Sequence, residues 1–140
     1  MTLKPRTAEA SLWMSSPDTA EATSLSPEDT LPAVLATSRM TGLMELAAMR
    51  LMKQNLRNGE SSVGIAMNVT HAAHSTVNGT VRAVATYAGV AGRLHRFDIN
   101  VFDESGLIGS AKHTRTVVVE RRLLAVARRG AGKTGTLLMA

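Results

Sequence analysis

Three polar side chains follow one another along an otherwise apolar segment, "LATSRMTGLMELAAMRLM", residues 35–52. Thr37, Thr41 and Glu45 are spaced four residues apart, which stacks side chains on one face of a helix. A helical glutamate is commonly exposed, or paired with a neighbour such as Arg50. On a helix covered by a sheet, however, this line would lie in a cleft or at a subunit boundary. There, desolvation disfavours the charged carboxylate and poises it as a base or nucleophile.

Two histidines in "NVTHAAH" are the next candidates for chemistry. His71 is either a structural strand histidine or a proton carrier. His74 suggests a zinc pair with it, but residues three apart point to opposite faces of a strand. The chain also has no cysteine. We therefore expect no metal site and no cofactor.

Residues of two further predicted strands belong with these candidates. Gly64, in "SSVGIA", weakens a strand and marks either a bulge or the close approach of a ligand. His113 and Arg115, in "AKHTRTV", are two residues apart and share one face of a strand. At that face Arg115 either meets an anion or extends its charge into water.

The pattern of apolar residues predicts one long helix that would carry Glu45. Thr37 or Ser38 can cap its start, and Asn58-Gly59 is a left-handed stop for its end. Apolar residues recur close to the helical period at Met40, Leu43, Met44, Ala47 and Leu51.

Strand patterns surround this helix in the sequence. Alternating or β-rich stretches predict strands over residues 10–16, 61–73, 80–90, 93–102 and 107–120. Residues 16–32 are polar and bounded by prolines, so we expect a loop. The final twenty residues favour no single structure.

One helix and an antiparallel sheet indicate an α+β fold. A helix of ~20 residues is about 30 Å long and can cover one face of such a sheet. A curved sheet around one long central helix is the hotdog fold, and pairing into a dimer would help a small chain bury surface. The expected organisation is residues 1–30 as an N-terminal strand and loop, 31–120 as the hotdog core, and 121–140 as a basic C-terminal tail.

Composition limits the function classes. The 140 residues are 44% hydrophobic, which predicts one globular domain. No apolar run approaches the ~20 residues that span a bilayer, and the N-terminus lacks the apolar core of a secretory signal. The absence of cysteine fits a cytoplasmic protein. We therefore expect a cytoplasmic protein with no membrane partner.

The charge balance indicates an anionic partner. The chain has 16 Lys and Arg against 11 Asp and Glu, a net charge of +5. One Trp, one Tyr and two Phe give little material for stacking on bases, so nucleic acid is not expected. The stretch "ARRGAGKT" resembles a phosphate-binding loop, but only six residues follow Thr134, too few for the helix that such a loop needs.

Three separated segments in the right order resemble the fluoroacetyl-CoA thioesterase family of hotdog enzymes. They are "ATSRMTGLMELAAMRLM", "SVGIAMNVTHAA" and "IGSAKHTRTVV", and the resemblance covers roughly residues 27–119. It implies an acyl-CoA thioesterase that cleaves a small acyl-CoA into a carboxylate and free CoA, as a homodimer or a tetramer. The cationic surplus would meet the phosphates of CoA.

The resemblance also implies roles for individual residues. Thr37, Glu45 and His71 match the family's catalytic threonine, glutamate and histidine. Gly64 and Arg115 match residues that line the substrate pocket in relatives.

One departure concerns substrate choice. Relatives specific for fluoroacetyl groups have an aromatic lid residue six positions before the threonine, where this chain has Leu31. We therefore expect a thioesterase that is not specific for fluoroacetyl-CoA. Two alternatives on the same fold are a non-catalytic domain that binds acyl-CoA and a dehydratase or other lyase, since Glu and His also move protons in those reactions.

Overall fold

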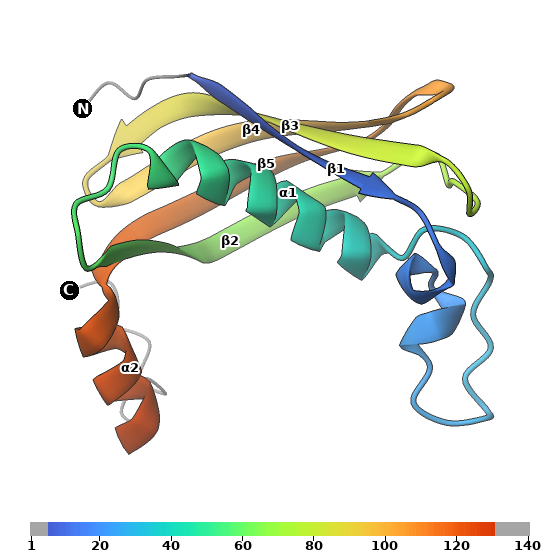
Figure 1. Cartoon of the computed structure of the whole chain (residues 1–140), viewed down its shortest axis with the longest axis horizontal. Coiled ribbons are helices and arrows are strands. Elements are labelled where there is room, and N and C mark those ends of the chain that lie inside the picture. Colours follow the sequence, from blue (N-terminus) through green and yellow to red (C-terminus); the bar gives the residue numbers. More distant parts are fainter. Residues whose placement is uncertain (1–5, 131–140) are drawn as a thin grey trace.

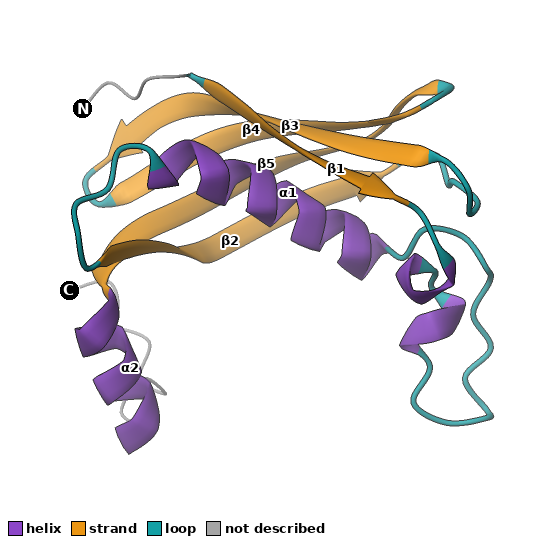
Figure 2. Cartoon of the chain, viewed as in Figure 1, coloured by secondary structure: helices purple, strands orange, loops and turns teal. Residues whose placement is uncertain are grey.

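A curved antiparallel sheet wraps one long helix (Figure 1). The computed structural model describes residues 6–130. Its sheet has the strand order β1-β3-β4-β5-β2, and α1 lies along the concave face (Figure 2). The elements are β1 (Thr7–Trp13), α1 (Thr37–Lys53), β2 (Glu60–His71), β3 (Thr80–Ala91), β4 (Leu94–Asp103), β5 (Gly106–Val119) and α2 (Glu120–Arg129), with short 3-10 helices at Ser16–Asp18 and Glu21–Thr23. The predicted α+β hotdog architecture is confirmed.

The core forms where the helix meets the sheet. The helix buries its periodic apolar face, which includes Met40, Met44 and Leu51. From the sheet, alternate residues of β3 and β4 point to the same core, since successive strand side chains face opposite sides. They are Val81, Ala83, Ala85, Tyr87, Phe97, Ile99 and Val101.

The ends of α1 differ from the prediction. The capping position is Ala36, so neither Thr37 nor Ser38 caps the helix. Thr37 is the first helical residue, and its hydroxyl bonds to another element instead. The helix ends at Lys53, and Gly59 takes its left-handed conformation, at φ 85°, in the turn that leads into β2. The glycine therefore shapes the strand entry rather than stopping the helix.

The strands follow their predicted ranges closely, with one larger shift. The first strand spans Thr7–Trp13 rather than residues 10–16, because Met14 already leaves the ladder to exchange backbone hydrogen bonds with residues 78 and 79. In β2 the pairing with β5 shifts register between Gly64 and Ala66. Of the two alternatives for Gly64, this is the bulge.

The segment that follows β5 is not a simple tail. Residues 120–129 form α2, and its first residues continue directly from the end of β5. Gly130 closes it in the left-handed conformation at φ 72°. No residue of α2 is fully buried, and the helix extends away from the sheet (Figure 1). The rest of the predicted basic tail, and the second half of the phosphate-loop-like stretch, lie outside the described residues.

β2 is an edge strand of twelve residues. A long edge presents unpaired backbone groups and is normally covered, shortened or paired with another chain. Across residues 6–130, no helix is long and apolar enough to cross a membrane.

Candidate active site

The N-terminus of α1 meets the end of β2 through two side chains. The Thr37 hydroxyl lies 2.8 Å from Nδ1 of His71. This contact explains why Thr37 does not cap the helix: its oxygen is committed to the imidazole. The first and third members of the expected catalytic trio therefore touch within one chain.

His71 also stacks on His74. The ring centroids are 4.1 Å apart with an interplanar angle of 47°. The expectation that the two rings point to opposite faces was wrong, because β2 ends at His71 and strand alternation stops there. Among residues 6–130, no three His, Asp or Glu side chains gather in a way that could hold a metal ion.

The environment of His71 favours a neutral ring. Burial lowers its pKa from the ordinary 6.5, and the neighbouring His74 acts in the same direction, while a hydrogen bond with the Ala73 backbone opposes both. Its Nε2 atom is buried and has no hydrogen-bond partner. A neutral imidazole can give or take a proton near pH 7, as general acid–base work requires.

Glu45 forms a second centre further along α1. Its Oε2 accepts a hydrogen bond from Nη1 of Arg115 at 3.3 Å. The Arg115 side chain is 6% exposed and that of Glu45 is 48% exposed. The expected partner Arg50 instead donates to the backbone oxygen of Glu9. Within one chain Glu45 is therefore charge-paired and accessible, and the cleft or subunit boundary that the sequence suggests for it stays a prediction.

Gly64 leaves room for this carboxylate. A Cβ atom at position 64 would lie 2.6 Å from Oε2 of Glu45 and 3.3 Å from Cε1 of His113. Any larger residue would push the acid away from its place beside Arg115. The bulge at Gly64 thus occurs, and the group that approaches the glycine is the Glu45 carboxylate rather than a ligand.

The two centres are separate within one chain. Thr37 and Glu45 are eight residues apart, which is ~12 Å along a helix axis. The line that they form with Thr41 is exposed or half-buried, so the sheet of the same chain does not cover it. Leu31 is 40% exposed on the loop before α1.

One residue of this site, Ser62, was not predicted from the sequence. Ser62 anchors Arg115, taking hydrogen bonds from it at both the side-chain and the backbone oxygen. His113 lies 3.1 Å from the same guanidinium. The shared face of His113 and Arg115 could be read from their spacing, but nothing in the sequence pointed to the serine.

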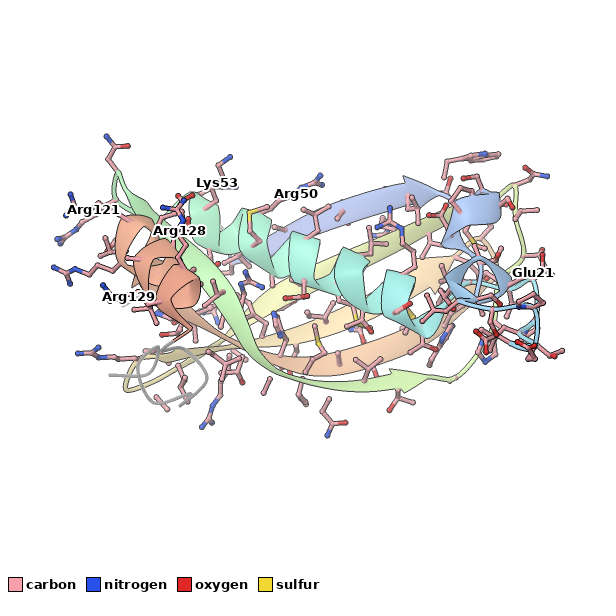
Figure 3. All side chains as sticks on the ribbon, turned by 90° about the horizontal axis from the view of Figure 1, so that it is seen from below. Glu21, Arg50, Lys53, Arg121, Arg128 and Arg129 are labelled. Atoms are coloured by element: carbon pink, nitrogen blue, oxygen red, sulfur yellow. The ribbon has the colours of Figure 1, made fainter. Side chains whose placement is uncertain are left out.

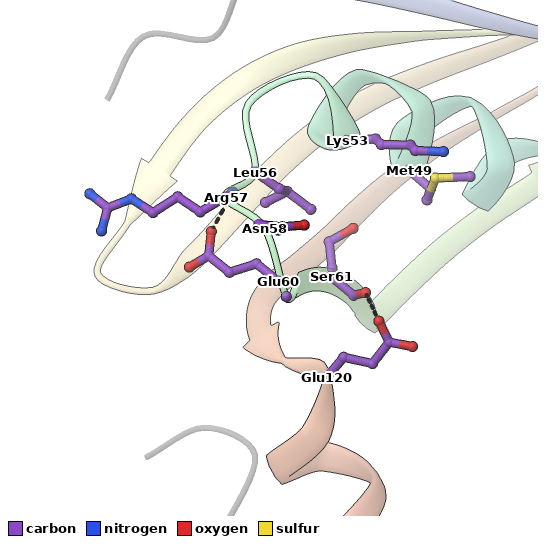
Figure 4. A pocket seen from close by; sticks show the side chains of 10 residues that line it. Met49, Lys53, Leu56, Arg57, Asn58, Glu60, Ser61 and Glu120 are labelled. Atoms are coloured by element: carbon purple, nitrogen blue, oxygen red, sulfur yellow. Dashed lines mark hydrogen bonds between the residues drawn. The ribbon is translucent and has the colours of Figure 1, made fainter.

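A hollow of about 590 Å³ adjoins the Glu45 centre (Figure 4). Its lining includes Met49, one helical turn beyond Glu45, and Ser62, which holds Arg115. Lys53 and Arg57 contribute cations. The remaining lining comes from residues 56 and 58–61 and from Glu120.

Several cationic side chains gather at the end of the molecule where this hollow lies. Figure 3 shows Arg50 and Lys53 of α1 at the same end as three arginines of α2, and Glu21 at the opposite end. The α2 residues are Arg121, Arg128 and Arg129. We call these five cationic side chains the basic end.

The architecture and these residues together define a hotdog protein of the thioesterase type. Residues 15–121 match the model of the family described as fluoroacetyl-CoA-specific thioesterase. The chain belongs to this family.

Individual relatives agree with this placement. The fluoroacetyl-CoA thioesterase of Streptantibioticus cattleyicolor is 40% identical over 87 residues, which span 62% of this chain and 63% of that relative. A crystal structure of a variant of the fluoroacetyl-CoA-specific thioesterase FlK superposes with a TM-score of 0.84 at 32% identity, covering 93% of this chain and 97% of that one. The structure of a FlK variant in complex with fluoroacetate and CoA superposes with a TM-score of 0.82 at 33% identity, covering 87% of this chain and 97% of that one.

The titration of His71 tests the geometry at the start of α1. In wild-type protein we expect an NMR pKa below 6.5 for His71. Replacing His74 with Ala removes the second cause of the shift, so the pKa of His71 should rise, yet remain below 6.5 because burial persists. An unchanged pKa in the His74→Ala variant would contradict the stacked arrangement.

Proposed function

We propose that this protein is an acyl-CoA thioesterase that hydrolyses a small acyl-CoA to a carboxylate and free CoA. One observation carries the proposal: the Glu45 carboxylate is seated between Gly64 and Arg115 on the same helix face as the Thr37–His71 pair. The family relationship and the likeness to a CoA-bound relative support it.

Each group has a defined task in this reaction. Glu45 takes a proton from the attacking water, or attacks the acyl carbon itself and is released by water. The C–S bond then breaks, and the neutral His71 takes up a proton released by the attacking water and passes it to the departing thiolate. Thr37 holds the imidazole through its 2.8 Å contact. Backbone groups near Gly64 and the uncapped start of α1 supply donors for the developing oxyanion.

Substrate binding involves three further residues. Gly64 lines the pocket by leaving space for the Glu45 carboxylate, and Arg115 holds that carboxylate in place beside the acyl group. Leu31 occupies the lid position and presents a flexible aliphatic group there. Because it replaces an aromatic ring, we propose that the enzyme accepts small acyl groups without specificity for the fluoroacetyl group.

We propose that the working unit is a homodimer joined along β2. The twelve-residue edge is unpaired in one chain, and the Thr37–Glu45 line beside it is uncovered. Antiparallel pairing of two β2 strands about a two-fold axis near residues 67–68 places Gly64 of one chain opposite His71 of the other. The Glu45 of one chain then faces the Thr37–His71 pair of its partner, which resolves their ~12 Å separation.

The basic end is positioned to hold the phosphates of CoA. The two carboxylates of the hollow already accept hydrogen bonds, Glu60 from the Arg57 backbone and Glu120 from Ser61. With the phosphates near Lys53 and the arginines of α2, the pantetheine arm runs past Met49 toward Glu45. A cysteine-free chain of this type fits a role in the cytoplasm.

Replacing Glu45 with Gln tests the catalytic assignment. The amide keeps the shape of the side chain but cannot act as base or nucleophile. We expect kcat for thiol release from acetyl-CoA to fall roughly 10²- to 10⁴-fold, with CoA affinity nearly unchanged by calorimetry. Equal turnover by wild type and Glu45→Gln would contradict the catalytic role of Glu45 and favour a domain that only binds acyl-CoA. An enoyl product in place of free thiol from a 3-hydroxyacyl-CoA would indicate a lyase.

Reversing one charge at the basic end tests the placement of the phosphates. An exposed charge pair between Lys53 and a CoA phosphate would contribute up to ~1 kcal/mol to substrate binding. Losing it in Lys53→Glu should therefore raise KM for acetyl-CoA roughly fivefold. The same variant should hydrolyse the acetyl thioester of N-acetylcysteamine, which has no phosphate, at the wild-type rate.

The matched control is Lys112→Glu, which changes the net charge equally at a side chain paired with Asp98. It should leave both substrates unaffected. If the two variants raise KM for acetyl-CoA equally, the effect comes from net charge and not from a phosphate-binding site at the basic end.

A further inference from the structure

Arg115 is a buried guanidinium whose donors are distributed over three elements. Its Nε donates to Oγ of Ser62 at 2.9 Å, and Nη2 donates to the Ser62 backbone oxygen at 2.8 Å. The remaining group, Nη1, lies between two acceptors, Oε2 of Glu45 at 3.3 Å and Nε2 of His113 at 3.1 Å. An arginine held this way points in a fixed direction.

The tautomer of His113 follows from its two contacts. Its Nδ1 is 2.8 Å from the Ala66 backbone oxygen, which can only accept, so Nδ1 carries the hydrogen. Nε2 is then a lone pair, and it accepts from Arg115. The ring is 2% exposed, so this arrangement is enclosed by the core.

The charge state of His113 agrees with this tautomer. Burial has the largest effect and lowers the pKa of His113 from 6.5. The Ala66 hydrogen bond opposes it, the adjacent Arg115 lowers the pKa further, and Glu45 raises it least. A second ring proton would meet the N–H of Arg115 head-on. The imidazole therefore stays a neutral acceptor near pH 7.

The bulge of β2 brings these groups together. Gly64 and Ala66 flank the register shift, one bounding the Glu45 carboxylate and the other holding the His113 ring. A Cβ at position 64 would contact both Glu45 and His113. One irregularity in one strand thus makes the space for the acid and fixes the ring behind its partner.

We propose that His113 is a positioning residue for the hydrolytic reaction: it locks Arg115, which in turn holds Glu45 by Oε2 and leaves Oε1 for the reacting water or acyl carbon. The proposal rests on the thioesterase function proposed above. His113 does not touch the substrate, and it acts only through the arginine.

The test compares two substitutions at this position. His113→Leu fills the space without an acceptor, and we expect kcat to fall about tenfold with KM for acetyl-CoA within twofold of wild type. His113→Gln offers an amide oxygen to Arg115 and should restore kcat to within about threefold of wild type. Equal kcat in wild type and His113→Leu, or a loss in His113→Gln as large as in His113→Leu, would overturn the proposal.

A second buried histidine provides the matched control. His95, on β4, is 7% exposed, and its Nδ1 bonds to the Tyr87 hydroxyl at 2.9 Å. His95→Leu should lower the melting temperature as His113→Leu does, but should reduce kcat much less. A similar loss of kcat in both variants would show a general effect of weakening the core.

Wild-type NMR keeps the proposal testable if a variant does not fold. The ¹⁵N shifts of His113 should show the Nδ1–H tautomer and a pKa below 6.5. The Nε2–H tautomer would refute the proposed chain of contacts, whatever the enzyme hydrolyses. Wild-type protein that releases no thiol from any acyl-CoA would instead refute the thioesterase function.

Discussion

The rigidity of α1 fixes the separation of the two chemical centres. Thr37 and Glu45 share a helix face, but eight residues of regular helix keep them ~12 Å apart. Each centre is anchored to a different part of β2, one at His71 and the other at Gly64. Within one chain the fold therefore presents two half-sites along one uncovered edge. In the proposed dimer, a second copy of that edge would supply what each half lacks.

The Glu45 half-site depends on a buried cation that is fully engaged. Burying a guanidinium is unfavourable unless its charge and its donors are compensated. Here Glu45 balances the charge of Arg115, and Ser62 and His113 take the other donors. Burial lowers the pKa of Arg115, while Glu45 opposes that effect. The basic end, by contrast, is exposed, and our proposal assigns the CoA phosphates to these surface side chains rather than to this internal arginine.

Much of the fold could be predicted from the sequence. Apolar residues recur at the helical period at Met40, Met44 and Leu51, and apolar and polar residues alternate in β3 and β4. The first pattern predicts a helix and the second predicts strands, and the structure has both. The cap and the histidine pair were predicted wrongly for related reasons. Local rules assign Thr37 to the helix cap, but a contact 34 residues away takes its hydroxyl.

The site was predictable only in part. Spacing placed Thr37 and Glu45 on one face, and placed His113 beside Arg115. Spacing cannot show that Ser62 anchors the arginine, because the bulge at residues 64–66 resets the register between β2 and β5. The α2 helix was missed because its four arginines resemble a solvated tail, and its start depends on where β5 ends.

Mixing two inactive variants tests the shared site most directly. Glu45→Gln and His71→Ala protein should each be nearly inactive toward acetyl-CoA. If the site is shared across β2, each heterodimer combines an intact Glu45 from one chain with an intact His71 from the other. After subunit exchange, followed by native mass spectrometry, the mixture should recover roughly a quarter of the wild-type rate. Heterodimers that form without any gain in activity would contradict the account.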